Sequence, residues 1–142
     1  MSDDLRPTSA GIGRVLIAVY GILALAAIGR SVYQIITKLD EAPVAYGLSA
    51  LAAAVYVLAT VALVARGAVW FRVAVIAIAF ELVGVLVVGT LSIIDPALFP
   101  DDTVWSQFGR GYAFIPLILP VLGLLWLRRV ARARSSAELV SA

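Results

Sequence analysis

The sequence predicts an all-α fold, a polytopic membrane protein whose four transmembrane helices form an antiparallel bundle, with a short surface helix between the third and fourth. Two observations predict this fold. Hydrophobic residues make up 63% of the chain and charged residues only 14%, which is more apolar surface than a soluble core of this length needs. The apolar residues are also gathered into four stretches separated by polar connections, as in a chain that crosses a bilayer repeatedly.

The first predicted span covers 13–38 and follows a polar cytoplasmic tail over 1–12. Its uncharged part, 15–29, has the length of a signal-peptide core. An acidic pair near the N-terminus is wrong for the basic start of a signal peptide, and apolar residues continue at helical spacing beyond Arg30. We therefore expect one uncleaved helix.

The second and third spans are predicted over 44–65 and 73–94, joined by so short a connection that they must form an antiparallel hairpin. The second is rich in alanine, and small residues spaced by four let helix backbones approach closely in lipid. At about 1.5 Å per residue the third is roughly 33 Å long, enough to cross the hydrocarbon core. The proline of Asp95-Pro96 ends it, because proline disfavours helix at the preceding residue.

The fourth span is predicted over 111–127, after the longest polar connection of the chain. Within that connection Val104, Trp105 and Phe108 form a one-sided apolar stripe, which predicts a short amphipathic helix at the membrane surface. The membrane domain thus spans 13–128. The polar composition of the remainder, 129–142, predicts a basic, disordered cytoplasmic tail.

The distribution of basic residues predicts that both termini are cytoplasmic, since lysine and arginine gather on that side. The inner side then holds eight basic residues and the outer side three. The eight are Arg6, Arg14, Arg66, Arg72, Arg128, Arg129, Arg132 and Arg134, and the three are Arg30, Lys38 and Arg110. Ten of the eleven are arginine, which is typical of GC-rich bacterial genomes and favours a bacterial cytoplasmic membrane.

Glu81 is the only charge in the third span, and a carboxylate at that depth should face protein, water or a partner. Counting residues from the inner boundary places Tyr56 and Pro120 at a similar depth. Tyr56 can donate a hydrogen bond to the carboxylate. Because Pro120 has no N–H, the carbonyl of Pro116 loses its helical partner, and a protonated Glu81 can donate to it. Glu81 is therefore interpreted as a buried packing contact within the bundle or across a subunit interface. A transport or proton site and a contact with a larger partner protein are the alternatives.

The remaining charges have plainer interpretations. Arg30 is expected to reach the outer rim by snorkelling, with Asp95 as one possible partner, and a buried ion pair with Glu81 is the alternative. The outer carboxylates Asp95, Asp101 and Asp102 favour helix capping over a metal site. The basic residues Arg128, Arg129, Arg132 and Arg134 can bind lipid headgroups, but they suit a stop-transfer and topology signal better.

Several classes of function are disfavoured by composition. The chain has no cysteine and no histidine, which excludes disulfides, thiolate and imidazole metal sites, and acid–base schemes that need histidine. No nucleophile–base–acid set can be assembled. The pairs Gly11-x-Gly13 and Gly109-x-Gly111 are not phosphate loops, because neither lies between a strand and a helix. We expect no enzyme activity, no cofactor, no metal and no nucleic-acid partner.

Residues 103–129, TVWSQFGRGYAFIPLILPVLGLLWLRR, resemble the last span of small uncharacterised four-span integral membrane proteins of actinobacteria. The resemblance covers about a fifth of the chain and implies a membrane location but no activity. Four short spans with one buried glutamate also resemble small multidrug-resistance transporters. In those the essential glutamate lies in an alanine-rich motif of the first helix, whereas here the first helix has no acid and Glu81 lies in the third.

The sequence therefore favours a non-catalytic accessory or scaffolding protein. Its partners would be the lipid bilayer, further copies of itself or a larger membrane complex, contacted through helix packing. The alternative is a small oligomeric transporter, coupled to protons or cations, that uses Glu81.

Overall fold

The computed structural model describes residues 2–38 and 40–141, and it describes the side chains of 11–38 and 40–140. The described residues form helices, turns and irregular connections, with no strand among them. In chain order the elements are α1 (Ser2–Lys38), α2 (Pro43–Val64), α3 (Ala68–Ile94), the 3₁₀ helices η1 (Pro96–Leu98) and η2 (Ser106–Tyr112), and α4 (Ile115–Ser141).

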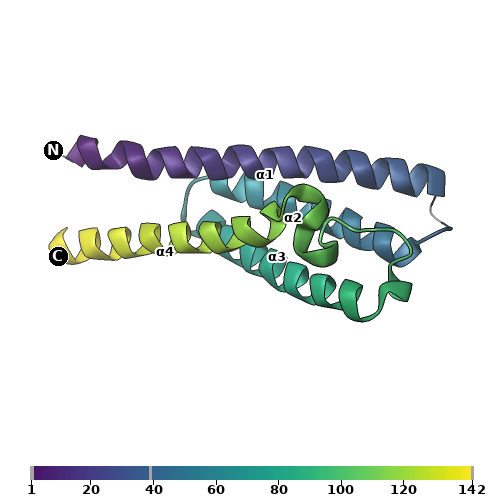
Figure 1. The fold of residues 1–142 in the computed structure, drawn as a ribbon. Coiled ribbons are helices and arrows are strands. Elements are labelled where there is room, and N and C mark those ends of the chain that lie inside the picture. Colours follow the sequence, from purple (N-terminus) through teal and green to yellow (C-terminus); the bar gives the residue numbers. More distant parts are fainter. Residues whose placement is uncertain (1, 39, 142) are drawn as a thin grey trace.

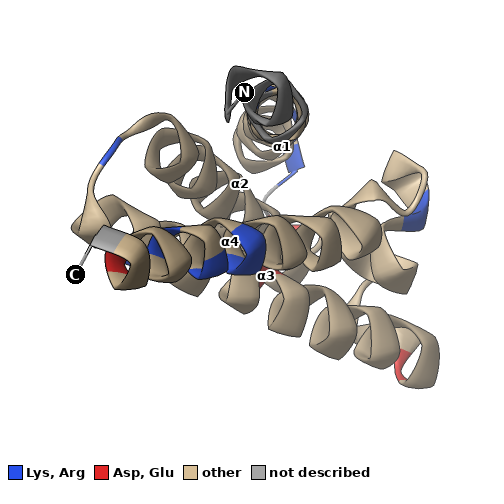
Figure 2. Ribbon diagram, turned by 90° about the vertical axis from the view of Figure 1, so that its left-hand side faces the viewer, with Lys and Arg blue, Asp and Glu red and all other residues tan. Residues whose placement is uncertain are grey.

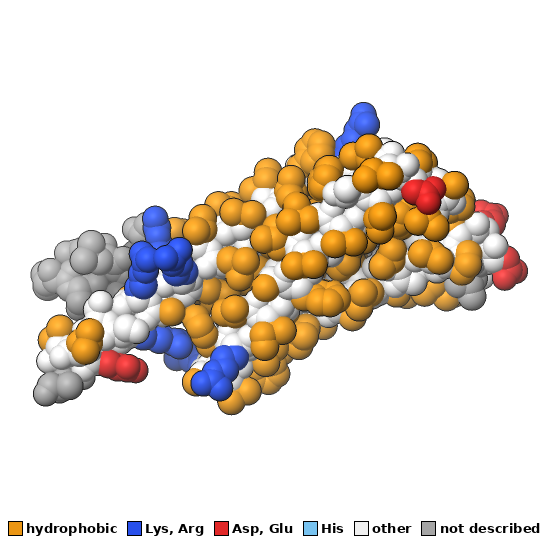
Figure 3. Space-filling model, turned by 90° about the horizontal axis from the view of Figure 1, so that it is seen from below, with side chains coloured by type: hydrophobic (Ala, Val, Ile, Leu, Met, Phe, Trp, Pro, Cys, Tyr) orange, Lys and Arg blue, Asp and Glu red, His pale blue; other side chains and the backbone are white. Residues whose placement is uncertain are grey.

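The helices alternate in direction, so that α1 begins and α4 ends at the same end of the molecule (Figure 1). We call this the terminal end and the opposite one the loop end. Three helices are long and apolar enough to cross a membrane, and a fourth span arises if η2 and α4 are counted together across their 98° bend. The predicted four-helix membrane bundle is therefore confirmed. On the face seen in Figure 3, hydrophobic side chains cover the middle of the molecule and charged groups lie mainly towards its two ends.

Small side chains bring α1 and α2 close together. The buried residues of α2 are mostly alanine, and Ala24 and Ala27 are buried on α1. In lipid, helices gain little from hydrophobic burial against one another, so close backbone approach and van der Waals contact hold them together. The alanine pattern of the second span thus has a packing role.

The helix boundaries differ from the predictions in four places. α1 begins at Ser2, where we predicted a tail over 1–12, although Met1 and the side chains of 2–10 lie outside the described residues. α3 begins at Ala68 instead of residue 73. α4 begins at Ile115 instead of residue 111 and continues to Ser141, where we predicted disorder. Hydropathy identifies the part of a helix that lies in lipid, but a helix continues into polar sequence as long as nothing ends it.

The connection between α3 and α4 departs most from the prediction. Residues 95–114, here called the re-entrant segment, turn back from the loop end into the bundle (Figure 1). A short helix, η2, does lie between α3 and α4, but it is not an amphipathic helix on the surface: it contains left-handed backbone at Gln107, Phe108 and Gly109, and the neighbouring Trp105 is only 1% exposed. The apolar stripe contacts protein where we expected it to contact the membrane surface.

Candidate functional site: a buried polar cluster beside the broken fourth span

The centre of the site is the carboxyl group of Glu81, which is completely buried on α3. The Tyr20 hydroxyl of α1 donates a hydrogen bond to Glu81 Oε2 at 2.7 Å. Glu81 Oε1 has no hydrogen-bond partner among the described residues. Among the described residues the carboxyl group therefore accepts one hydrogen bond, although its two oxygens can accept several hydrogen bonds.

Tyr56, the partner we expected for Glu81, binds elsewhere. Its hydroxyl accepts a hydrogen bond from Trp105 Nε1 at 2.9 Å. Its ring lies against that of Tyr20, with centroids 6.3 Å apart and planes tilted by 50°. Tyr56 thus links the re-entrant segment to α2 and supports the ring of the tyrosine that binds Glu81.

Pro116 and Pro120 are both among the most completely buried residues, as expected, but neither contributes the predicted acceptor. Because Glu81 Oε1 has no partner among the described groups, the hydrogen bond to the carbonyl of Pro116 is not formed. Pro116 is the second residue of α4, a position where its missing N–H costs little. Pro120 lies inside the helix.

Three glycines let the re-entrant segment pack closely. A Cβ atom on Gly84 would lie 2.6 Å from Trp105 Cζ3, and one on Gly89 would lie 2.4 Å from Phe108 Cδ1. Gly109 has φ +82°, and a Cβ there would lie 2.7 Å from Cδ of Pro116. The first two form recesses on α3 for aromatic rings, and the third permits the left-handed turn that leads into α4.

Several backbone groups of the segment have partners within the protein, which lowers the cost of irregular backbone in a membrane interior. The Ser92 hydroxyl of α3 accepts a hydrogen bond from the Gln107 amide at 2.8 Å. The Phe114 amide donates to the Gly109 carbonyl at 3.0 Å, and the Phe114 carbonyl accepts from the amides of Leu117 and Ile118. These bonds give the backbone on both sides of the bend partners other than lipid or water.

Two contacts hold the segment at the loop end. Arg30 donates from Nη2 to the Asp102 carbonyl at 2.6 Å, so its partner is a main-chain oxygen and not the Asp95 side chain we considered. The Tyr46 hydroxyl donates to Asp101 Oδ2 at 3.0 Å. Among the described residues no three carboxylates gather in a way that could hold a metal ion.

Replacing Arg30 with alanine should loosen this attachment. The Asp102 carbonyl loses a charged donor, and such bonds are stronger than neutral ones. Because this bond is exposed to solvent, its net contribution is only about 1 kcal/mol, so we expect amide hydrogen exchange over 101–106 to become about fivefold faster. Lys38→Ala, which removes a charge at the same end without removing the Arg30 contact, is the control. Equal exchange in Arg30→Ala and the unmodified protein would contradict the attachment.

The basic residues after the fourth span lie on α4 at the terminal end (Figure 2). Arg134 stacks over the ring of Phe71, with its guanidinium carbon 5.3 Å from the ring centroid. Arg128, Arg129 and Arg132 line a groove between α1 and α4. The four arginines we grouped therefore divide into one that packs on α3 and three that face a groove.

Sequence reasoning missed Tyr20 and Trp105 as members of the site. Tyr20 lies near the depth of Glu81, but depth alone does not distinguish it from Tyr56, the tyrosine that we expected to bind the carboxyl group. Trp105 was assigned to a surface helix. The glycines at 84 and 89 were the available signal, since glycine inside an apolar helix often marks a close approach of another group.

The fold and the buried cluster together define a polytopic α-helical membrane protein with a broken fourth span. Comparison with protein-family models, with curated proteins and with solved structures found no match.

Proposed function

We propose that this protein is a non-catalytic accessory or scaffolding protein that packs against a transmembrane helix of another copy or of a larger membrane complex. The observation that carries the proposal is a shallow apolar groove of about 430 Å³ on the outside of the bundle. It is lined by Ile28 of α1 and by Ala53, Ala54, Val57, Leu58 and Val61 of α2. Small residues in such a surface let a second helix approach closely in lipid.

The interior supports the same proposal. Trp105 and Tyr56 attach the re-entrant segment to the bundle, and Tyr20 binds Glu81. Polar groups in a bundle interior commonly hold helices together in this way. These four buried side chains thus have partners inside the bundle. The groove on the outside of α1 and α2 is the surface where we propose that a partner helix packs.

The proposal is tested by filling the groove. Ala54→Trp places a large ring where a partner helix would pack, and Ile76→Trp adds the same ring to an exposed position of α3 outside the groove. After purification in mild detergent, we expect proteins or copies recovered with the unmodified chain and with Ile76→Trp to be missing from Ala54→Trp. A clean monomer from the unmodified chain, or partners retained by Ala54→Trp, would contradict the proposal.

A second candidate is a small proton- or cation-coupled transporter that uses Glu81. The specific observation is a buried carboxyl group beside a broken helix whose Oε1 has no hydrogen-bond partner in the described part of the chain, a combination that membrane transporters use for ion sites. Reconstituted Glu81→Gln should then lose proton flux that Glu138→Gln, at the terminal end of α4, retains. Equal flux in the Glu81 variant and the unmodified protein would exclude this function.

We also propose a bacterial cytoplasmic membrane as the location, with the terminal end inside. The eight-to-three division of basic residues supports this orientation. Because the chain has no cysteine, single cysteines at Ala97 and Ser135 report topology. We expect a membrane-impermeant maleimide to label Ala97→Cys in intact cells and Ser135→Cys only after permeabilisation. The reverse pattern would invert the orientation.

A further inference from the structure

The groove between α1 and α4 at the terminal end has an apolar interior and a basic mouth. It encloses about 770 Å³, within the range of about 300–1,000 Å³ usual for small-molecule sites. Its apolar wall consists of Ile12, Val15 and Leu16 on α1 and of Leu122 and Leu125 on α4. Three arginines, at 128, 129 and 132, lie on the same lining.

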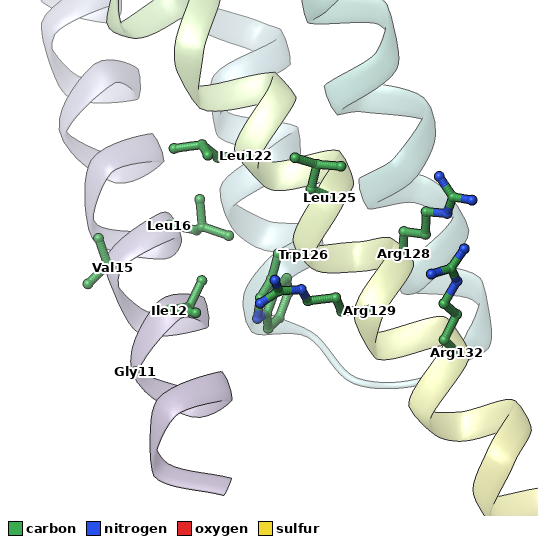
Figure 4. A pocket seen from close by; sticks show the side chains of 10 residues that line it. All are labelled: Gly11, Ile12, Val15, Leu16, Leu122, Leu125, Trp126, Arg128, Arg129 and Arg132. Carbon is green, nitrogen blue, oxygen red and sulfur yellow. The ribbon is translucent and has the colours of Figure 1, made fainter. Parts of the chain in front are cut away.

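The groove exists because α1 and α4 touch at few places. Near the terminal end they meet where Trp126 packs on Gly13, so closely that a Cβ there would lie 2.8 Å from the indole ring. Figure 4 shows Ile12 and Leu16 directed towards α4 and Leu122 directed towards α1. These side chains face one another across the opening and form a surface suited to hydrocarbon.

The arginines supply the other half of an amphipathic site. Arg129 extends towards α1 near Trp126, while Arg128 and Arg132 lie side by side further round α4 (Figure 4). The described residues that line the groove include no carboxylate to balance these three charges. Guanidinium groups bind phosphate through paired N–H donors, and basic residues at a membrane surface attract anionic lipids.

We propose that this groove binds one anionic phospholipid from the leaflet at the terminal end. The acyl chains lie along the apolar wall, the phosphate binds Arg129, which extends towards α1, and Arg128 and Arg132 add positive charge on the other side of α4 (Figure 4). Charge complementarity selects this occupant: a transmembrane helix of a partner would fill the apolar wall but leave three arginines facing hydrocarbon or water. A zwitterionic lipid fits the same shape but carries no net charge to balance the arginines.

The test is lipid retention by the full-length protein. The protein is reconstituted in vesicles of phosphatidylglycerol and phosphatidylcholine, and bound lipids are identified by native mass spectrometry. We expect a phosphatidylglycerol adduct on the unmodified chain and about 100-fold weaker binding in Arg128→Gln/Arg129→Gln/Arg132→Gln, as three basic residues contribute at a membrane surface. Arg66→Gln/Arg72→Gln, which removes charge at the same end outside the groove, should retain the adduct.

Two further variants separate the groove from charge alone. Leu122→Trp fills the apolar part without changing charge and should lose the adduct, whereas Ile76→Trp, on the exposed side of α3, should keep it. Equal retention by the triple arginine variant, or by Leu122→Trp, would overturn the proposal. So would an equal loss in Arg66→Gln/Arg72→Gln. Leu122→Cys should give no disulfide-linked dimer, and formation of one would assign the groove to a second copy.

Discussion

Gly84→Ala is expected to destabilise the bundle by about 1–3 kcal/mol, the usual effect of adding a methyl group to a fully packed site. The new Cβ would lie 2.6, 2.9 and 3.0 Å from three atoms of the Trp105 ring. That ring cannot move freely, because it is buried and its Nε1 donates to Tyr56. The thermal midpoint in detergent should fall, and the rate of hydrogen exchange over 103–112 should rise, because Trp105 of the re-entrant segment can no longer pack closely on α3.

The controls are two other helical glycines. A Cβ on Gly29 or Gly47 meets nothing within 4 Å, so alanine there should be neutral or stabilise by up to about 1 kcal/mol through helix propensity. A double-mutant cycle with Trp105→Leu should show that the Gly84→Ala penalty disappears once the ring is gone. An unchanged midpoint for Gly84→Ala would show that the segment does not pack on α3 as described.

Tyr20→Phe is expected to cost about 1–3 kcal/mol, the penalty for leaving a buried polar group without a partner. The substitution removes the hydrogen bond to Glu81 Oε2, while Oε1 is already unpaired among the described residues. Thermal unfolding in detergent measures the effect. Tyr33→Phe on the same helix, where the ring is 61% exposed, should leave the midpoint unchanged.

The double variant Tyr20→Phe/Glu81→Leu should recover most of the lost stability, because replacing both members of a buried polar pair by apolar groups is often neutral or stabilising. This outcome is expected if Glu81 is a packing contact. A double variant as unstable as Tyr20→Phe alone would mean that the carboxyl group has a further stabilising partner.

The membrane spans were predictable because each one meets the requirements of the membrane interior through its own residues alone. A helix in lipid satisfies all its backbone hydrogen bonds within one segment, so 44–65 and 73–94 could be predicted from composition. The first matches α2 to within one residue at each end, and the second ends where α3 ends but begins five residues late. The hairpin between them follows from a short connection. Glu81 was likewise identifiable, since a single acid in an apolar span requires a non-lipid environment.

The partners of Glu81 were not predictable, because they depend on the register between helices. Tyr20 and Tyr56 were both tyrosines at plausible depths, and the arrangement of α1 beside α2 lets the Tyr20 side chain reach the carboxyl group on α3. The end of α3 was likewise predictable, but the path of the re-entrant segment was not. An apolar stripe at helical spacing fits a membrane surface or a protein interior equally well.

The outcome for the stripe at Val104, Trp105 and Phe108 depended on α3, where Gly84 and Gly89 leave room for two aromatic rings. A glycine in an apolar helix indicates that another group can approach closely, but the sequence does not identify that group. Composition and spacing therefore specified which segments enter the membrane, since each helix meets that requirement alone. The broken fourth span, the Tyr20–Glu81 pair and the basic groove required side chains from separate helices to meet, and those contacts exist only in the assembled bundle.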